Sequence, residues 1–174
     1  MRKFIKFILL LCLCPLLCLL AYYFYPEKTL PRHCHIDKIV VLKSKRQMMV
    51  YEKGNILKTY KISLGYRPIG DKKYEGDSRT PEGCYIIYGK NPNSLCHKNL
   101  GISYPNENDI KEAKAMGRNP GGNIKIHGLL NGRGYLRKFH RWKDWTNGCI
   151  GVTDNEIDDL YCHVLIRARI EILP

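Results

Sequence analysis

The residues of this chain with the clearest capacity for chemistry are His127 and Cys149, which stand twenty-two positions apart. Both lie in the stretch 124–154, which reads IKIHGLLNGRGYLRKFHRWKDWTNGCIGVTD. The alternation of apolar and polar residues before His127 is typical of a half-buried strand, and Gly148 lets the backbone turn tightly beside the cysteine. A histidine at a strand end can take up a thiol proton, and backbone N–H groups at the turn can hold an oxyanion. The pattern fits a cysteine nucleophile with a histidine base, while the residues alone leave open that Cys149, one of eight cysteines, is a packing residue or a disulfide partner.

The local sequence also resembles the active-site signature of the L,D-transpeptidase (YkuD-type) family, an Ile-His-Gly followed by a variable spacer and Ser/Thr-x-Gly-Cys. The matching residues here are His127, Gly128, Thr146, Gly148 and Cys149. The resemblance covers the chain from about residue 39 to the C-terminus. Its further matching segments are 70–72, 75–83, 102–106, 120–122 and 144–150.

The resemblance implies that the substrate is the peptide stem of peptidoglycan and that no metal or organic cofactor is needed. Cys149, as a thiolate, would attack the carbonyl of the diamino acid in a tetrapeptide stem and expel the terminal D-alanine. His127 would lower the pKa of the thiol by ion pairing and then protonate the leaving amine. The Gly128 carbonyl would orient the imidazole. The amides of Gly148 and Cys149, and that of Asn147 in addition, would form the oxyanion hole.

The spacer between the two motifs supplies the remaining candidate site residues. Trp145 and Thr146, next to the Gly-Cys pair, are expected to line the substrate site. Arg133 and Arg141 belong to a basic cluster that either contacts substrate carboxylates or forms a solvated loop. His140 is a rival base, but neighbouring basic residues disfavour its protonated form, and the Ile-His-Gly context favours His127.

Two positions depart from the family pattern, and they leave the acceptor of the acyl group open. Asn147 stands where the general pattern has a histidine, and Gly151 stands where it has arginine or asparagine. The thioester is then resolved by an amine, which makes the chain an L,D-transpeptidase, or by water, which makes it an L,D-hydrolase. A non-catalytic, membrane-tethered wall-binding module is the alternative of another class, although a pure binder has no use for a thiol beside a base. A thiol–disulfide oxidoreductase is disfavoured because no Cys-x-x-Cys is present.

The amino terminus predicts export. Residues 1–25 begin with a short basic opening, and an uncharged, leucine-rich run over residues 7–24 is long enough for a membrane anchor or an uncleaved signal. Residues 26–35 are polar, contain two prolines and are interpreted as a linker to a catalytic domain over 36–174. The expected location is the bacterial cell envelope, with the catalytic domain either anchored to the inner membrane or secreted.

The charge and the cysteines limit the partners further. A net charge of +13 attracts polyanions such as the anionic cell wall, and no nucleic-acid-binding motif is present. The expected partners are therefore peptidoglycan stems and, through residues 7–24, a membrane. If Cys149 is a free thiol, four further cysteines outside the apolar run could form two disulfides in three alternative pairings, or stay reduced: Cys34, Cys84, Cys96 and Cys162.

The elements that must position His127 and Cys149 are mostly strands. The patterns predict strands over 39–42, 47–51, 56–64, 84–88, 124–127 and 164–173, with a loop at 65–81 and a turn at 91–94. Residues 52–55 are expected to form the turn of a hairpin between 47–51 and 56–64, and the spacer between Gly128 and Trp145 has a loop-like composition. In the last strand, the apolar residues Ile166, Ala168, Ile170 and Ile172 are expected to alternate with Arg167, Arg169 and Glu171. A helix is expected over 109–116, and a second one after the capping box formed by Thr153 and Glu156. These elements predict a mainly β (α+β) domain with a few short helices, preceded by one hydrophobic helix. The resemblance implies the mixed-sheet L,D-transpeptidase catalytic fold.

Overall fold

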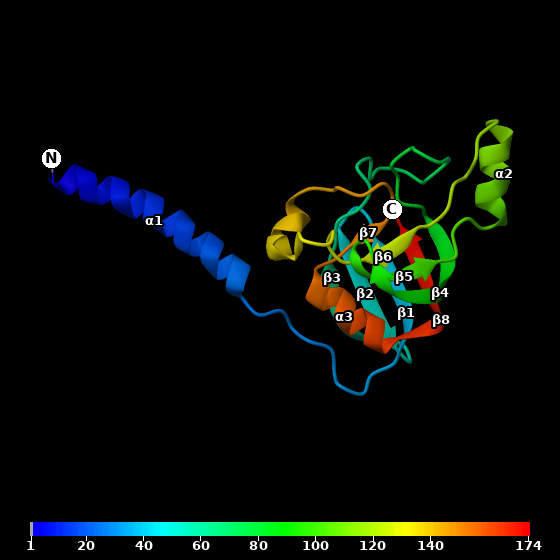
Figure 1. The fold of residues 1–174 in the computed structure, drawn as a ribbon, viewed down its shortest axis with the longest axis horizontal. Helices are drawn as coiled ribbons and strands as arrows, with labels where there is room; N and C mark the ends of the chain where they lie inside the picture. Colours follow the sequence, from blue (N-terminus) through cyan, green and yellow to red (C-terminus); the bar gives the residue numbers. More distant parts are fainter. Residues whose placement is uncertain (1) are drawn as a thin grey trace.

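The computed structural model describes the backbone of residues 2–174 and the side chains of residue 11 and residues 13–174. Its centre is a curled, mixed eight-stranded sheet with the strand order β3-β2-β1-β8-β4-β5-β6-β7 (Figure 1). The strands are β1 (Ile36–Leu42), β2 (Gln47–Glu52), β3 (Asn55–Lys61), β4 (Gly83–Ser94), β5 (His97–Ile102), β6 (Lys125–His127), β7 (Ile150–Gly151) and β8 (Val164–Leu173). The helices are α1 (Arg2–Phe24), α2 (Glu107–Ala115), the 3-10 helix η1 (Gly134–Trp142) and α3 (Asp154–His163). The predicted fold class is confirmed.

The sheet curls far enough for its two ends to meet. The chain leaves β3 at one edge, and Ser63 then exchanges two backbone hydrogen bonds of 2.9 and 2.8 Å with Gly151 at the other edge. Two residues further on, Gly65 forms a bridge to Thr146. The segment that carries Cys149 is therefore held by backbone bonds on both sides. Apolar side chains fill the inside of the curl, among them Ile39, Leu64, Ile87, Ile102, Ile126, Ile150 and Ile170.

Local sequence signals explain the hairpin and the two short helices. The β2–β3 hairpin closes through Lys53 and Gly54, both with positive φ (49° and 84°), as a two-residue primed turn requires. The predicted capping box of Thr153 and Glu156 is present at the start of α3. Helix α2 begins two residues earlier than predicted, because Asn106 caps it in a second capping box.

Three sequence predictions about the elements are wrong. Strand β4 runs on to Ser94 through the predicted turn at 91–94, and the chain reverses at Leu95 and Cys96 instead. Ile166 was expected to face inward with alternate residues of β8, yet it is exposed. A bulge at Arg167, with φ of 71°, resets the alternation before Ala168. The spacer predicted as a loop contains η1.

The segment predicted as a linker packs against the domain. Leu30 and Cys34 are buried in the main apolar cluster, and the Glu27 carboxylate accepts a hydrogen bond from Arg141 at 2.8 Å. At the end of α1, the rings of Tyr22 and Tyr23 lie 5.8 and 5.6 Å from the ring of Phe139 in η1. The end of α1 and the following segment therefore make contacts with the stretch between His127 and Cys149.

The predicted membrane segment, residues 7–24, lies within α1, and some of its side chains fall outside the described residues. In the part of the chain that the structure describes, no helix is both long enough and apolar enough to span a membrane. The four cysteines considered for disulfides are free thiols: Cys34, Cys84, Cys96 and Cys162.

Candidate active site

The pairing of two short strands puts His127 and Cys149 on one face of the sheet. Strand β6 runs parallel to β7, with Ile126 beside Ile150 and His127 beside Gly151. Because side chains alternate along a strand, the two isoleucines point into the core together, and His127 lies on the other face. Cys149 immediately precedes Ile150, so it shares that other face with His127. The histidine and the cysteine thus lie on one face of neighbouring strands, with His127 in register with Gly151, two residues after Cys149.

His127 is held in one orientation by the residue that follows it. Its Nδ1 lies 2.7 Å from the Gly128 carbonyl oxygen, so Nδ1 carries the proton and donates it in a hydrogen bond. The other ring nitrogen, Nε2, is then the one that can accept a proton. Burial lowers the pKa of His127, against the opposing effect of the bond to Gly128. The imidazole is therefore neutral at neutral pH.

Cys149 is a protonated thiol in this structure. Its Sγ donates to the Asn123 carbonyl oxygen at 3.6 Å. Burial raises the pKa of Cys149, and a hydrogen bond from the Lys125 backbone and the charge of Lys125 only partly oppose this. The expected thiolate–imidazolium pair is thus not the resting state. A thiol in this state can act as a nucleophile only after it loses its proton.

The turn before Cys149 can be made only with glycine at position 148. Gly148 has a φ of +125°, and a Cβ there would lie 2.5 Å from the Arg79 carbonyl oxygen. Thr146 is buried at the centre of this turn. Its Oγ1 accepts from the Gly148 amide at 3.1 Å and donates to the Cys149 carbonyl oxygen at 2.7 Å. Thr146 therefore shapes the cysteine loop.

The same contacts change the expected oxyanion hole. The Gly148 amide was predicted to be one of its donors, but it is already used by Thr146. Within the described part of the chain, no side chain holds the Asn147 or Cys149 amide in this way. These two amides are the better candidates for the oxyanion hole.

Trp145 contacts the imidazole of His127. The two rings meet edge to face at 5.5 Å with an interplanar angle of 74°. The indole also lies over Gly151, where a Cβ would be 3.0 Å from the ring. Small size at position 151, one of the two departures from the family pattern, makes room for Trp145. Its predicted role in substrate binding stays a prediction.

His140, the rival base, is buried behind Trp145. Its Nδ1 accepts from the Trp145 indole N–H at 3.4 Å and lies 3.0 Å from Ser63 Oγ. Burial, with the charges of Arg141 and His127, lowers the pKa of His140 to about 3. A group of such low basicity is a weak general base at neutral pH, so the geometry favours His127.

This buried histidine also predicts an acid-sensitive fold. The pKa of His140 is depressed from 6.5 to about 3, so its contribution to stability is complete above pH 6.5 and is lost as the pH falls toward 3. The free energy of unfolding should fall by about 1.4 kcal/mol per pH unit in that window through this group. Urea unfolding at pH 7 and pH 5 should show a smaller loss for His140→Asn than for the unmodified chain. Equal losses in both proteins would contradict the assignment.

The two arginines predicted to bind substrate lie in different settings. Arg141 was expected to contact substrate carboxylates, but it donates to Glu156 at 2.7 Å and to Glu27 at 2.8 Å, and its side chain is only 7% exposed. Its charge is balanced by these two ion pairs, which gives Arg141 a structural role, and its contact with substrate stays a prediction. Arg133 is exposed on the loop before η1, and its contact with substrate stays a prediction.

Two contacts at the site were not predicted from the sequence. The Asn123 carbonyl accepts from the Cys149 thiol, and the Asp154 carboxylate accepts from the Leu129 amide at 2.8 Å. A backbone carbonyl has no sequence signal. Asp154 is visible in the sequence only as the residue after the capping Thr153, where an acidic residue is ordinary.

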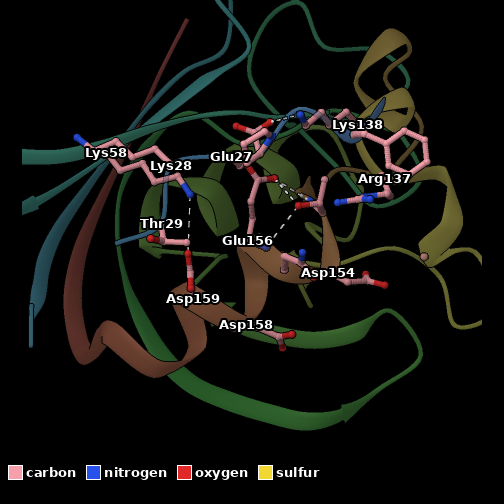
Figure 2. Close-up of a pocket in the computed structure, with 15 residues that line it drawn as sticks. Glu27, Lys28, Thr29, Lys58, Arg137, Lys138, Asp154, Glu156, Asp158 and Asp159 are labelled. Atoms are coloured by element: carbon pink, nitrogen blue, oxygen red, sulfur yellow. Dashed lines mark hydrogen bonds and ion pairs between the residues drawn. The ribbon is translucent and has the colours of Figure 1, made fainter. Parts of the chain in front are cut away.

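A cavity of about 540 Å³ lies beside this site, with Asp154 in its wall. It contains neither His127 nor Cys149. Figure 2 shows that acidic residues of α3 face basic residues of β3 and η1 across it. Its charged lining includes Lys58, Arg137, Lys138, Asp154, Glu156 and Asp159.

Comparison with solved structures identifies several that are similar to this chain. Among solved structures, the chain is similar to the helical cell shape determining protein Pgp2 from Campylobacter jejuni, with 26% identity, a TM-score of 0.57, and coverage of 88% of this chain and 53% of that one. It shares its fold with Bd1075 from Bdellovibrio bacteriovorus, at 20% identity, a TM-score of 0.57 and coverage of 83% and 51%. It also shares its fold with the L,D-transpeptidase from Mycobacterium smegmatis, with 14% identity, a TM-score of 0.51, and coverage of 78% of this chain and 58% of that one. No curated protein matches the chain.

The chain spans about half the length of the solved proteins it matches first. The match to a catalytic-domain family is more extensive. Residues 36–172 match the L,D-transpeptidase catalytic domain, YkuD, and this range contains His127, Cys149 and every strand of the sheet except the last residue of β8, Leu173. The chain therefore belongs to the L,D-transpeptidase catalytic domain family.

Proposed function

We propose that this protein is an L,D-transpeptidase that acts on peptidoglycan stem peptides through a thioester on Cys149. The observation that carries the proposal is the parallel pairing of β6 and β7, which puts His127 and Cys149 on one face of the sheet. The fixed imidazole supports it, because His127 Nδ1 is bound to Gly128 and Nε2 is left for the thiol proton. Family membership supplies the substrate class.

The proposed reaction proceeds in two transfers. The proton of Cys149 passes to His127 Nε2, and the sulfur attacks the carbonyl carbon of the third residue of a tetrapeptide stem. The amide bond to the terminal D-alanine breaks, and its nitrogen leaves with the proton from His127. The amine of a second stem then attacks the thioester, His127 removes the proton of that amine, and the thiol is restored. The Asn147 and Cys149 amides hold the oxyanion in both transfers.

We place this activity in the cell envelope, where the family acts. The basic opening and the apolar run of residues 7–24 are consistent with a protein that is delivered to the outside of the inner membrane. The positive net charge of +13 would favour residence near anionic wall polymers. Both statements are proposals about the whole protein.

Incubation with purified tetrapeptide-stem muropeptides tests the proposed reaction. The full chain should give dimers with loss of D-alanine, read by mass spectrometry, and Cys149→Ala should give none. The matched control is Cys162→Ala, which removes an exposed thiol and should leave the products unchanged. Shortened monomers alone would replace the amine acceptor by water and make the protein an L,D-hydrolase. Activity that survives in Cys149→Ala would overturn the nucleophile assignment, and inactivity on several muropeptide types would favour a wall-binding module.

A further inference from the structure

A single peptide unit joins the imidazole of His127 to a carboxylate. The carbonyl of the Gly128–Leu129 peptide accepts from His127 Nδ1 at 2.7 Å. The N–H of the same peptide donates to Asp154 Oδ1 at 2.8 Å. In a trans peptide the C=O and N–H point in opposite directions, so the peptide can link two groups on its two sides. The groups linked in this way are, in order, imidazole, peptide and carboxylate.

The link has an electrostatic consequence. A hydrogen bond to an ionised acceptor is stronger than one between neutral groups, and a chain of hydrogen bonds polarises its members by about 10–30% per bond. An anionic Asp154 on the N–H draws electron density toward the Gly128 oxygen. That oxygen becomes a better acceptor for the Nδ1 proton, most of all when the ring is an imidazolium. The carboxylate thus favours the charged form of His127 without touching it.

The position of Asp154 is set by its surroundings. It is the first residue of α3, directly after the capping Thr153, and the start of a helix favours an anion. A Cβ on Gly128 would lie 2.7 Å from Asp154 Oδ1, and a Cβ on Gly134 would lie 2.5 Å from Oδ2. The carboxylate therefore lies in close contact with two glycines, one on each side. Only glycine at position 128 allows this approach.

We propose that Asp154 is a positioning residue that acts on His127 through the Gly128–Leu129 peptide. In the reaction, the Cys149 proton goes to Nε2, the Nδ1 proton stays on the ring in its bond to Gly128, and no proton reaches Asp154. The carboxylate keeps the proton on Nδ1 before the transfer and stabilises the imidazolium after it. The link to catalysis rests on the proposed function, whereas the effect on the imidazole does not.

The first measurement is the titration of His127 by NMR in the full chain, with His127→Gln used to identify the signal. Asp154→Asn keeps an oxygen acceptor and removes the charge, so the pKa of His127 should fall by about 0.5 pH unit. Asp154→Ala removes the acceptor as well, and the shift should be larger. The matched control is Asp158→Asn, which removes a carboxylate from the same helix and should leave the titration unchanged.

The second measurement is the alkylation of Cys149 by iodoacetamide across a pH range, which needs no muropeptide. The rate at neutral pH should fall about threefold in Asp154→Asn and about tenfold in Asp154→Ala. If the muropeptide reaction proceeds, kcat should fall with these rates and KM should change less than twofold. Unchanged titration and alkylation in the folded Asp154→Asn and Asp154→Ala variants would overturn the proposal. An absent muropeptide reaction with shifted titration would overturn the proposed function alone.

Discussion

Replacing His127 with glutamine should lower the rate of thioester formation at Cys149 by about 10²–10⁴-fold, the usual contribution of a positioned general base. The effect is large because burial raises the pKa of the Cys149 thiol, so few molecules hold a thiolate without the histidine. Glutamine is close in size and can still donate to the Gly128 carbonyl. The rate is read as the mass increase of the protein when it is mixed with tetrapeptide stems.

The control for this prediction is His140→Asn. His140 is buried behind Trp145 and is not expected to exchange protons with the thiol, so its replacement should change the acylation rate by less than tenfold. The pH profile adds a second readout. Alkylation of Cys149 in the free protein should have its midpoint above 9.0, the ordinary value for a thiol, because the pKa is raised. A normal rate in His127→Gln with a large loss in His140→Asn would transfer the role of base to His140.

The parts of the fold that the sequence predicts correctly are those set by local signals. The capping box of Thr153 and Glu156 predicts the start of α3 because both residues act within one turn of helix. The hairpin of β2 and β3 is predicted by its turn residues and by alternation. The pairing of β6 with β7 is different. The alternation before His127 predicts the strand that ends there, but the two residues of β7 are too few to show a pattern, so its pairing with β6 has no local signal.

The predictions that are wrong depend on contacts between distant residues. η1 packs against Tyr22 and Tyr23, more than a hundred positions earlier, and the local sequence of the spacer gives no sign of these partners. Leu30 and Cys34 are isolated apolar residues in a polar segment, so the sequence predicts a linker although both are in the core. The bulge at Arg167 moves Ile166 to the outside, and a bulge has no composition that marks it.

In the turn from Thr146 to Cys149, too, the sequence does not predict which single hydrogen bonds form. The motif predicts that the amides around Cys149 face an oxyanion, but it does not say which of them the loop uses for itself. Thr146 Oγ1 takes the Gly148 amide because its hydroxyl reaches both that amide and the Cys149 carbonyl. Residue type and spacing therefore identify the nucleophile, and the backbone path decides which donors are left.

The sequence also does not distinguish a basic residue that contacts substrate from one that forms a structural ion pair, and Arg141 is an example. In the structure it joins Glu156 of α3 to Glu27 of the N-terminal segment, and the Glu156 side chain is 3% exposed. Removal of one partner of a buried pair leaves the other charge without compensation. Arg141, near the end of η1, therefore links the spacer to α3, the helix that carries Asp154.

Arg141→Ala should therefore lower the free energy of unfolding by roughly 3–5 kcal/mol, the typical effect of breaking a buried ion pair. The matched control is Arg133→Ala, since Arg133 belongs to the same spacer, just before η1, and is exposed; its effect should stay within about 0.5 kcal/mol. Urea unfolding of the full chain in mild detergent, followed by circular dichroism, measures both. Equal stabilities of the two variants would show that the Glu156 carboxylate needs no partner and would return Arg141 to the candidates for substrate binding. A large loss of unfolding free energy in Arg141→Ala alone would mean that this part of the basic spacer stabilises the fold through the ion pairs of Arg141.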